Sequence, residues 1–290
     1  MANAFNGKVP DALGEGRQLL LERPHASACR SAIRRQRHFS PAGGARHMNS
    51  FGEPLRLLGW ITGADAEQLD QLARERVADF APREDIVSEG DPPQFMHAVL
   101  RGWLCHYKAL PNGRRQITGF SLPGDICDER VFLIRQMDHS IAAVTNATVG
   151  LIDRHRLQDL MGRRPRLQQA MARQSYLRLS MQREWLVSVG QRGAIERLAH
   201  LLCELHLRLE AVGQAEPDSC EMPLTQSEIA EATGLSTVHV NRTLQELRAA
   251  NLIVLRDRTL QIPDLRALRE AAMFDPSYLR CGDKDVPGNG

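Results

Sequence analysis

The chain has 290 residues, of which 42% are hydrophobic and 25% charged, and its formal net charge is +2. This length allows two packed domains, and the near-neutral charge indicates neither a polybasic coat for nucleic acid nor an acidic tail. No run of about 18 apolar residues predicts a membrane span, and no apolar segment follows Arg34-Arg35 to form a signal peptide. We therefore expect a cytoplasmic protein.

The first 47 residues are rich in Gly, Pro, Ala and Arg and show no sustained hydrophobic period, which predicts a disordered extension. Residues 1–50 hold eight Lys or Arg against three Asp or Glu. Two interpretations stay open for this segment. It is either a basic arm that contacts nucleic-acid phosphates, or a non-native extension upstream of a true start at Met48.

Residues 48–164 change from a helical to a strand-like pattern. A helical period from Leu55 to Phe80 places Leu69, Leu72 and Val77 on one side. Short runs rich in Val, Ile, Thr and aromatic residues follow between 86 and 153, separated by Gly, Pro or Asn, with a turn at "PNGR" (111–114). Such spacing predicts a small all-β sandwich or roll.

A helix is predicted from Pro165 to about residue 190, because apolar residues recur in steps of three and four. Its main stripe is Leu167, Met171, Gln174, Leu177, Met181 and Trp185. One alternative is a helix packed on the β-roll. The other is a dimer seam, which we favour because Leu179 and Leu186 add apolar side chains away from the stripe.

A second helix is predicted from Ala194 to Val212. Its expected buried face is Ile195, Leu198, Leu201, Leu202, Leu205 and Leu209. The polar segment "GQAEPDSCEMP" then interrupts the helical pattern.

The stretch "LTQSEIAEATGLSTVHVNRTLQELRAANLI" has the pattern of a helix-turn-helix. Thr225 followed by Glu228 predicts a capping box, with a helix beginning at Gln226. Gly234 permits a tight turn, and Leu235 fills the space between the helices. Ser236 is then a cap for the second helix.

The second helix of this motif has two faces of different chemistry. Val240, Leu244 and Leu247 are expected to face the core, because they recur at steps of four and three. The outward face then carries Thr237, Val238, Asn241, Arg242 and Gln245. Arginine suits guanine, amides suit adenine or phosphate, and methyl groups suit thymine, so the helix is shaped for a DNA major groove.

The segment "NLIVLRDRTLQI" predicts a β-wing in which Arg256 and Arg258 meet phosphates. The alternative for the whole motif is a plain helical hairpin with a solvated polar face. Its net charge over 224–262 is zero, four basic against four acidic residues, so electrostatics alone does not nominate DNA.

Residues 51–275 resemble the Crp/Fnr family of bacterial transcription regulators. The resemblance rests on the helix-turn-helix stretch and on "EGD" (89–91), Gly102, "NGR" (112–114), "PGD" (123–125) and Ser140. It implies an α+β fold with an N-terminal cyclic-nucleotide-binding-like β-roll, jelly-roll-like, over 48–164. A dimerisation helix over 165–190, a winged helix-turn-helix over 191–275 and a tail over 276–290 would follow. It also implies a homodimer that binds double-stranded DNA and RNA polymerase.

The resemblance assigns roles to individual residues. Arg242 falls on the family's base-reading arginine and Ser236 on its phosphate-binding cap. Val238 and Thr237 replace a glutamate and an arginine of well-known members, so this chain should read different half-sites.

The family's effector pocket corresponds to Gly124, Asp125, His139 and Ser140. Cyclic-nucleotide-binding relatives have a glutamate where this chain has Asp125, and an Arg-Ser or Arg-Thr pair where it has His139-Ser140. A mostly neutral histidine lacks the bidentate fork that holds a phosphate. We therefore expect no response to cyclic AMP and assign no cofactor.

The six cysteines, at 29, 105, 127, 203, 220 and 281, show no C-x-x-C pair, which predicts reduced thiols without a structural metal site. An iron–sulfur cluster lacks ligands near the N-terminus, where only Cys29 is found. A haem or metal site stays open if some of five residues meet in the roll, the alternative being ordinary core positions. These are His97, Cys105, His106, Cys127 and His139.

No enzyme motif is present in the sequence. Two functions follow from different classes of protein. The first is a homodimeric, sequence-specific transcription regulator on an inverted-repeat operator, with a sensor β-roll for an unknown effector. The second is a small-molecule sensor module whose helical C-terminal region contacts a protein.

Overall fold

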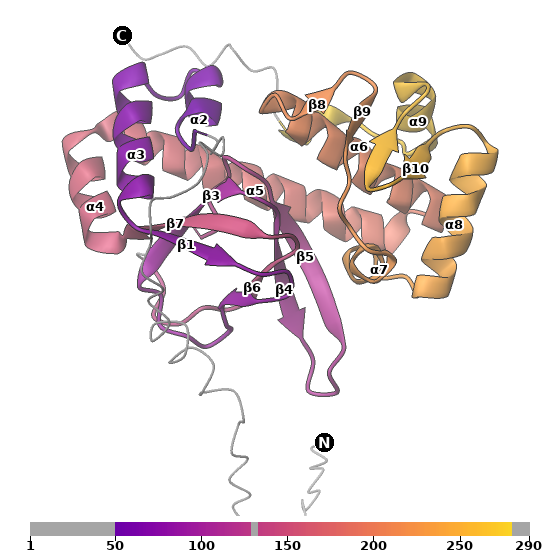
Figure 1. The fold of residues 1–290 in the computed structure, drawn as a ribbon, viewed down its shortest axis with the longest axis horizontal. Coiled ribbons are helices and arrows are strands. Elements are labelled where there is room, and N and C mark those ends of the chain that lie inside the picture. The colour runs from indigo at the N-terminus through magenta and orange to yellow at the C-terminus, as the bar shows by residue number, and fades with distance from the viewer. Residues whose placement is uncertain (1–49, 129–132, 280–290) are drawn as a thin grey trace, which may run out of the picture. The chain divides into compact units, whose positions relative to one another are not determined.

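The computed structural model describes residues 50–128 and 133–279 (Figure 1). The predicted basic extension over 1–47 lies outside these residues, as does the part of the predicted tail from 280 onward. No helix in the described ranges is long and apolar enough to cross a membrane.

Within the described residues, two helices precede the first strand: α2 (Glu53–Leu57) and α3 (Gly63–Glu75). Thr62 and Asp65 form a capping box at the start of α3. The prediction that helix continues to Phe80 is wrong, because β1 (Val77–Phe80) pairs with β7 (Ala147–Asp153) through residues such as Val77 and Gly150. A side chain at Gly150 would collide with the backbone of Ala73, so α3 packs directly on β7.

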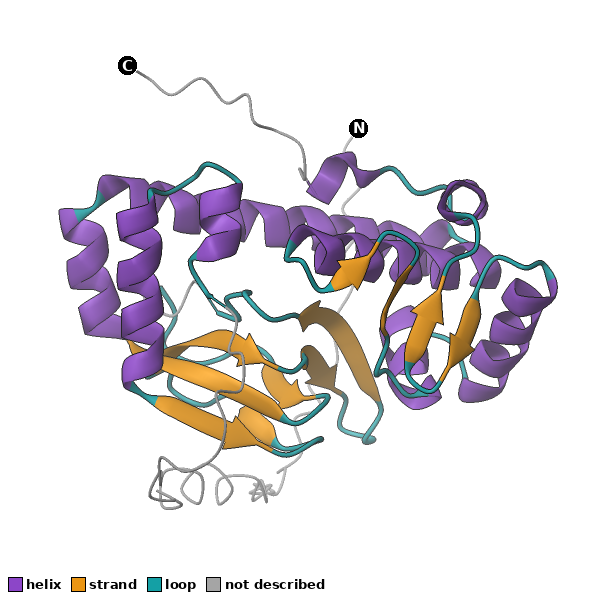
Figure 2. Ribbon diagram, turned by 45° about the horizontal axis from the view of Figure 1, so that its top comes forward, coloured by secondary structure: helices purple, strands orange, loops and turns teal. Residues whose placement is uncertain are grey.

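Seven antiparallel strands form the β-roll and confirm the predicted fold class (Figure 2). One sheet has the order β1-β7-β3 and the other β2-β6-β4-β5. The remaining strands are β2 (Asp85–Val87), β3 (Phe95–Arg101), β4 (Leu104–Ala109), β5 (Arg115–Ser121) and β6 (Ser140–Ala143). The "PNGR" turn joins β4 to β5, and Gly113 adopts a φ of 82° there.

Helix α4 (Arg154–Arg163) leads into the long helix α5 (Pro165–Gln191). The start of the predicted stripe is buried at Leu167, Met171 and Gln174, while Met181 and Trp185 pack partly buried against the C-terminal core. The stripe thus contacts the chain's own core. A different face of α5 exposes Leu186, Val187 and Val189, with Leu186 73% exposed.

Helix α6 (Ala194–Ala211) follows after a two-residue connection. Leu198, Leu201, Leu202, Leu205 and Leu209 are buried as predicted. The prediction for Ile195 is wrong: it is 40% exposed, because it lies in the first turn of α6, ahead of the buried part of the helix.

The C-terminal region combines helices with a four-stranded sheet of order β10-β11-β9-β8. The segment "GQAEPDSCEMP", which is predicted to interrupt the helical pattern, contains β8 (Ala215–Glu216) and β9 (Ser219–Glu221). Helix α9 (Leu265–Ala271) is followed by a 3-10 helix, η1 (Pro276–Leu279). Leu279 is buried, so the first residues of the predicted tail belong to the packed structure.

Candidate functional site

Helix α7 (Gln226–Thr233) is the first helix of the helix-turn-helix, and its ends are capped as the sequence predicts. The Thr225 hydroxyl accepts a hydrogen bond from the Glu228 amide, and the Glu228 carboxylate accepts one from the Thr225 amide. Gly234 ends the helix in the left-handed region, with φ of 68°. These local contacts fix the angle at which the second helix leaves.

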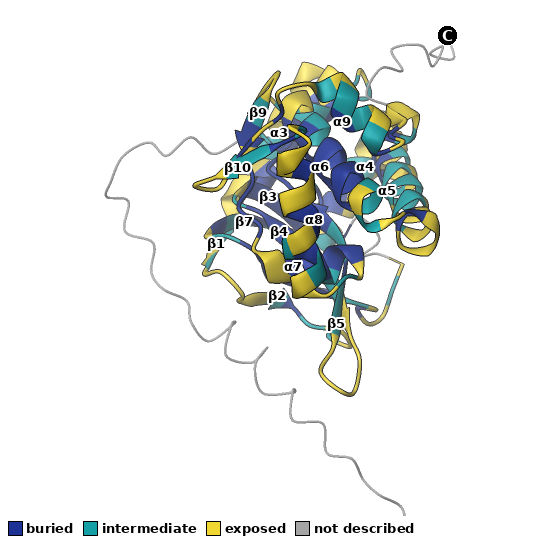
Figure 3. Ribbon diagram, turned by 90° about the vertical axis from the view of Figure 1, so that its right-hand side faces the viewer, coloured by how far each residue is buried: buried dark blue, intermediate teal, exposed yellow. Residues whose placement is uncertain are grey.

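Helix α8 (Thr237–Ala249) carries the predicted DNA-reading residues. The Ser236 hydroxyl caps it by accepting from the His239 amide at 3.2 Å. Val240, Leu244 and Leu247 are almost fully buried, as predicted. The opposite face is exposed in Figure 3 and comprises Ser236, Thr237, Val238, Arg242 and Gln245.

Side chains on the exposed face are only loosely held. Val238 is 80% exposed, and the Arg242 guanidinium lies 3.8 Å from the Glu246 carboxylate across one helical turn. Asn241 is half-buried and donates to Gln226 of α7, while it accepts from Gln245. Gln226 is therefore a further polar group on this face, one that sequence reasoning did not single out.

The wing is a hairpin of β10 (Val254–Arg256) and β11 (Thr259–Gln261). Asp257 and Arg258 turn the chain with φ of 49° and 63°. Arg256 and Arg258 are both exposed, so their guanidinium groups are available to phosphates.

A cavity of about 220 Å³ lies between strands β4 and β5 of the roll and helices α5 and α6. The polar groups in its lining are His106, Lys108, Thr118, Cys127, Asp138, His139, Arg178, Gln182, Glu204 and Arg208. Gly119, Phe120, Met181 and Trp185 complete the lining. The site therefore joins residues of both halves of the chain.

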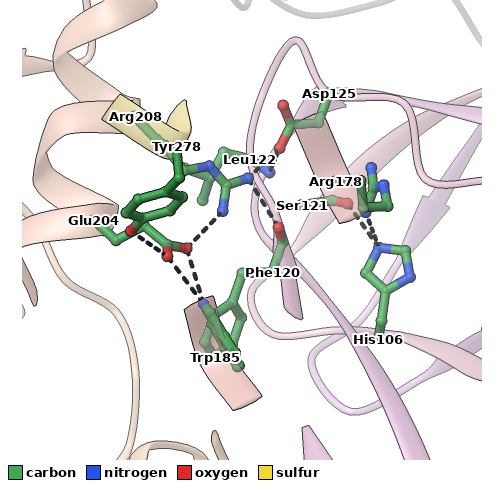
Figure 4. A network of polar contacts seen from close by, with 10 residues as sticks. All are labelled: His106, Phe120, Ser121, Leu122, Asp125, Arg178, Trp185, Glu204, Arg208 and Tyr278. Carbon is green, nitrogen blue, oxygen red and sulfur yellow. Dashed lines mark hydrogen bonds and ion pairs between the residues drawn. The ribbon is translucent and has the colours of Figure 1, made fainter. Parts of the chain in front are cut away.

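His106 is a buried polar group of the cavity, with only 5% of its surface exposed. One ring nitrogen lies 2.9 Å from His139. The other lies 2.8 Å from Ser121 Oγ and 3.2 Å from the Arg178 guanidinium (Figure 4). Burial, followed by the positive charge of Arg178, holds the pKa of His106 well below its usual value. His106 is consequently neutral at physiological pH.

Two family models match the chain: the cyclic nucleotide-binding domain over residues 77–164 and the Crp-like helix-turn-helix domain over 196–271. The nitrogen fixation regulation protein FixK of Bradyrhizobium diazoefficiens is 30% identical over 195 residues, which cover 67% of this chain and 80% of that protein. The chain belongs to the Crp/Fnr family of transcription regulators.

Other Crp/Fnr proteins agree with this assignment. The transcriptional activatory protein AadR of Rhodopseudomonas palustris is 27% identical over 76% of this chain and 88% of that protein. The solved structure of FixK2 from Bradyrhizobium japonicum matches with a TM-score of 0.62 and 23% identity, and the match covers 68% of this chain and 96% of that one. This last likeness shows the fold, and the family comprises regulators rather than enzymes.

Of the four predicted effector residues, only His139 lines the cavity. The Ser140 hydroxyl accepts a hydrogen bond from the Glu89 amide at 2.9 Å. Gly124 has a φ of 93°, which L side chains rarely adopt. A Cβ atom at this position would also lie only 2.8 Å from the Pro54 ring. Asp125 accepts from the Leu122 amide and from Arg208 of α6. Of these four residues, the structure thus places only His139 at the cavity.

The five residues considered for haem or a metal do not form one cluster. His97 Nδ1 lies 2.9 Å from Asp128, and the two side chains form a buried pair. His106, His139 and Cys127 line the cavity, whereas Cys105 packs in the hydrophobic core shared with α6. Burial raises the pKa of the Cys105 thiol to about 12, which disfavours the thiolate that binds metals. The described residues contain no group of three or more side chains suited to a metal ion.

A second polar cluster belongs to the cavity lining and was not predicted from the sequence. Glu204 of α6 is fully buried and accepts hydrogen bonds from Trp185 Nε1 and from the Tyr278 hydroxyl (Figure 4). Burial raises the pKa of Glu204, and Arg208 opposes this shift. The only sequence signal was a Glu and an Arg spaced by four on an otherwise apolar helical face.

Proposed function

We propose that the protein is a homodimeric transcription regulator that binds double-stranded DNA at an inverted-repeat operator through helix α8. The observation that carries this proposal is the division of α8 into a buried apolar face and a capped, exposed face. That exposed face carries side chains suited to base edges and phosphates, and an α-helix fits into a major groove.

The proposed contacts follow from side-chain chemistry. Arg242 provides a two-pronged donor for guanine O6 and N7, while the methyl groups of Thr237 and Val238 suit thymine. Asn241 and Gln245 provide amides for base edges or phosphates. Ser236 and the wing residues Arg256 and Arg258 contact the DNA backbone.

Dimerisation is proposed through α5. Leu186, Val187 and Val189 leave an apolar surface on its C-terminal half that residues 50–128 and 133–279 do not cover. A two-fold axis along such a helix pairs two copies of α8 and predicts half-sites about one helical turn, roughly 10 base pairs, apart. Acting on DNA with RNA polymerase, the dimer would work in the cytoplasm.

The β-roll is proposed as the sensor, with the cavity around His106, His139 and Arg178 as the effector site. The absence of a glutamate and an Arg-Ser pair at the family positions argues against cyclic AMP. The alternative function, a sensor module whose C-terminal region contacts a protein, predicts no salt-dependent binding to DNA.

Two variants with matched surface changes test dimerisation and DNA binding together. Leu186→Glu places a charge on the proposed seam, whereas Leu57→Glu places one on α2, where Leu57 is 55% exposed. We expect the native protein and Leu57→Glu to sediment at twice 32.5 kDa and to bind DNA with an affinity that falls steeply with salt. Leu186→Glu should sediment as a monomer and bind weakly. A monomeric native protein that binds a full inverted repeat contradicts the proposal.

A further inference from the structure

Strand β5 of the roll is fastened to the DNA-binding half of the chain at both of its ends. At its start, Arg115 Nε lies 2.7 Å from a Glu231 carboxylate oxygen on α7. The neighbouring Gln116 donates to the Ala232 carbonyl, also on α7, at 3.3 Å. The first helix of the helix-turn-helix is therefore held by a β-strand of the sensor.

The second attachment lies just beyond the other end of β5. Arg208 of α6 donates to the Asp125 carboxylate at 2.6 Å and to the Phe120 carbonyl at 2.9 Å (Figure 4). The Asp125 and Arg208 side chains are only 22% and 11% exposed, so solvent weakens this ion pair less than a surface pair. The Phe120 ring meets Trp185 edge-to-face at 5.9 Å, which adds an apolar contact at the same place.

The contacts at the two ends of β5 limit movement at the short connection between α5 and α6. Helix α5 ends at Gln191 and α6 begins at Ala194, so only Arg192 and Gly193 join the proposed dimer helix to the DNA-binding half. Both residues have extended backbone angles, with ψ of 142° and 169°. Rotation about them would swing α8, and contacts from the roll to α6 and α7 restrict that rotation.

The contacts between the β-roll and helices α6 and α7 leave the exposed face of α8 uncovered. Val238 is 80% exposed and Arg242 67%, and no β-roll residue forms a hydrogen bond or ion pair with either side chain within the described ranges. The contacts from the roll are made to α6 and to α7. An inhibitory contact would cover α8, so this arrangement fits one that prepares the helix for DNA.

We propose that the pairs Asp125–Arg208 and Arg115–Glu231 are positioning contacts that set the separation of the two α8 helices in the dimer. The β-roll thereby determines which half-site spacing the protein accepts, while α8 determines which bases it accepts. Holding α8 in place before binding removes part of the entropic cost of engaging two half-sites at once. This inference rests on the proposed function, because it requires dimeric binding to DNA.

Asp125→Asn is the main test variant, because an amide oxygen can still accept from the Leu122 amide while the charge that faces Arg208 is lost. Glu75→Gln is the control, since it alters an ion pair with Arg156 that joins α3 to α4 and does not involve the DNA-binding half. Each protein is titrated by fluorescence anisotropy with three kinds of DNA at fixed salt. The first is the operator that the native protein selects from random DNA. The second is the same operator with one or two base pairs added or removed between its half-sites, and the third is a single half-site.

Asp125→Asn should weaken binding to the selected operator by roughly three- to tenfold, because the freed domains lose their preset separation. Its affinity for the altered spacings should fall less, so its spacing profile is flatter than the native one. Its single half-site affinity should match that of Glu75→Gln. An unchanged spacing profile overturns the inference. Equal weakening on the half-site also overturns it, because it indicates a general structural role.

A charge exchange tests the other pair. Arg115→Glu and Glu231→Arg should each flatten the spacing profile, and the double variant should restore it, because the two side chains are similarly exposed at 27% and 26%. Failure of the double variant to restore spacing preference removes this pair from the inference. If the native protein binds none of these DNAs, the proposed function itself fails, which is distinct from binding that ignores spacing.

Discussion

The DNA-reading half and the sensor half of the chain relate differently to their sequence motifs. In the reading half, Thr225, Gly234 and Ser236 form the caps and turn expected of them, and Val240, Leu244 and Leu247 are buried. In the sensor half, motif positions are present but serve other contacts: Asp125 binds Arg208, and Ser140 binds the Glu89 backbone.

A short sequence motif predicts local structure more reliably than it predicts a ligand pocket. Capping and helical phase depend on neighbours within four residues, so they follow from a short sequence. A ligand pocket depends on strands and helices that are distant in sequence, such as β4 with α5 and α6 here. The contacts of a motif residue such as Asp125 therefore have to be taken from the structure.

The largest expected effect separates the two faces of α8. Leu244→Ala should lower the free energy of unfolding by about 2–5 kcal/mol, because it removes most of a buried side chain from a packed core. Val238→Ala, on the exposed face, should change it by less than about 0.5 kcal/mol. Urea denaturation followed by circular dichroism measures both. Equal losses would place Val238 in the core and reverse the assigned faces.

The next effect concerns base reading. Arg242→Ala should cost about 1–3 kcal/mol of binding free energy, mainly at one base pair of each half-site. Arg256→Ala and Arg258→Ala in the wing should weaken binding to all sequences alike and reduce its salt dependence. Binding curves against the operator and its single-base variants give the comparison. A uniform loss for Arg242→Ala identifies it as a phosphate contact and contradicts the proposed placement of α8.

The next prediction concerns how the stability of the protein depends on pH through two buried histidines, His200 in the DNA-binding half and His106 in the sensor half. Burial, aided by Arg192, lowers the pKa of His200 in α6 to about 3. The unfolded chain therefore binds a proton at His200 that the folded chain does not, from about pH 6.5 downward. Stability is retained above that pH and falls as the solution becomes more acidic, by at most about 1.4 kcal/mol per pH unit for one histidine.

His200→Gln should therefore flatten the loss of stability between pH 6.5 and about 4.5. His106→Gln, in the β-roll, should also reduce the loss of stability over this pH range, because burial lowers the pKa of His106 as well. Thermal midpoints measured at half-unit pH steps give the slopes. Parallel curves for the native protein and both variants would show that neither histidine is kept neutral by the fold.

The smallest expected effect is a response to cyclic AMP. His139 lies beside His106 and Asp138, and Asp125 is engaged by Arg208, so neither family position offers the expected nucleotide contact. Calorimetric titration with millimolar nucleotide should give no heat of specific binding. Micromolar affinity for cyclic AMP would show that the cavity beside Arg178 accepts a phosphate. The motif positions of the sensor half would then predict its ligand as well as those of the DNA-reading half predict its structure.

The sequence predicted most of the fold, and its failures have physical causes. Helix was wrongly extended through Val77 because an apolar residue at helical spacing also fits a strand, and only pairing with β7 decides between them. Strands β8 and β9 were missed because both are very short and depend on pairing, β9 with β11 and β8 with β9. Arg178, Glu204 and Arg208 escaped notice because helix periodicity does not show which distant loop a charged side chain meets.

Selection of bound fragments from random DNA tests the central claim most directly. The account predicts an inverted repeat whose half-site centres lie about one helical turn, roughly 10 base pairs, apart, with one base pair per half-site at which discrimination is lost in Arg242→Ala. Recovery of a single, non-repeated motif, or no enrichment above non-specific binding, would contradict a dimer that reads DNA through α8.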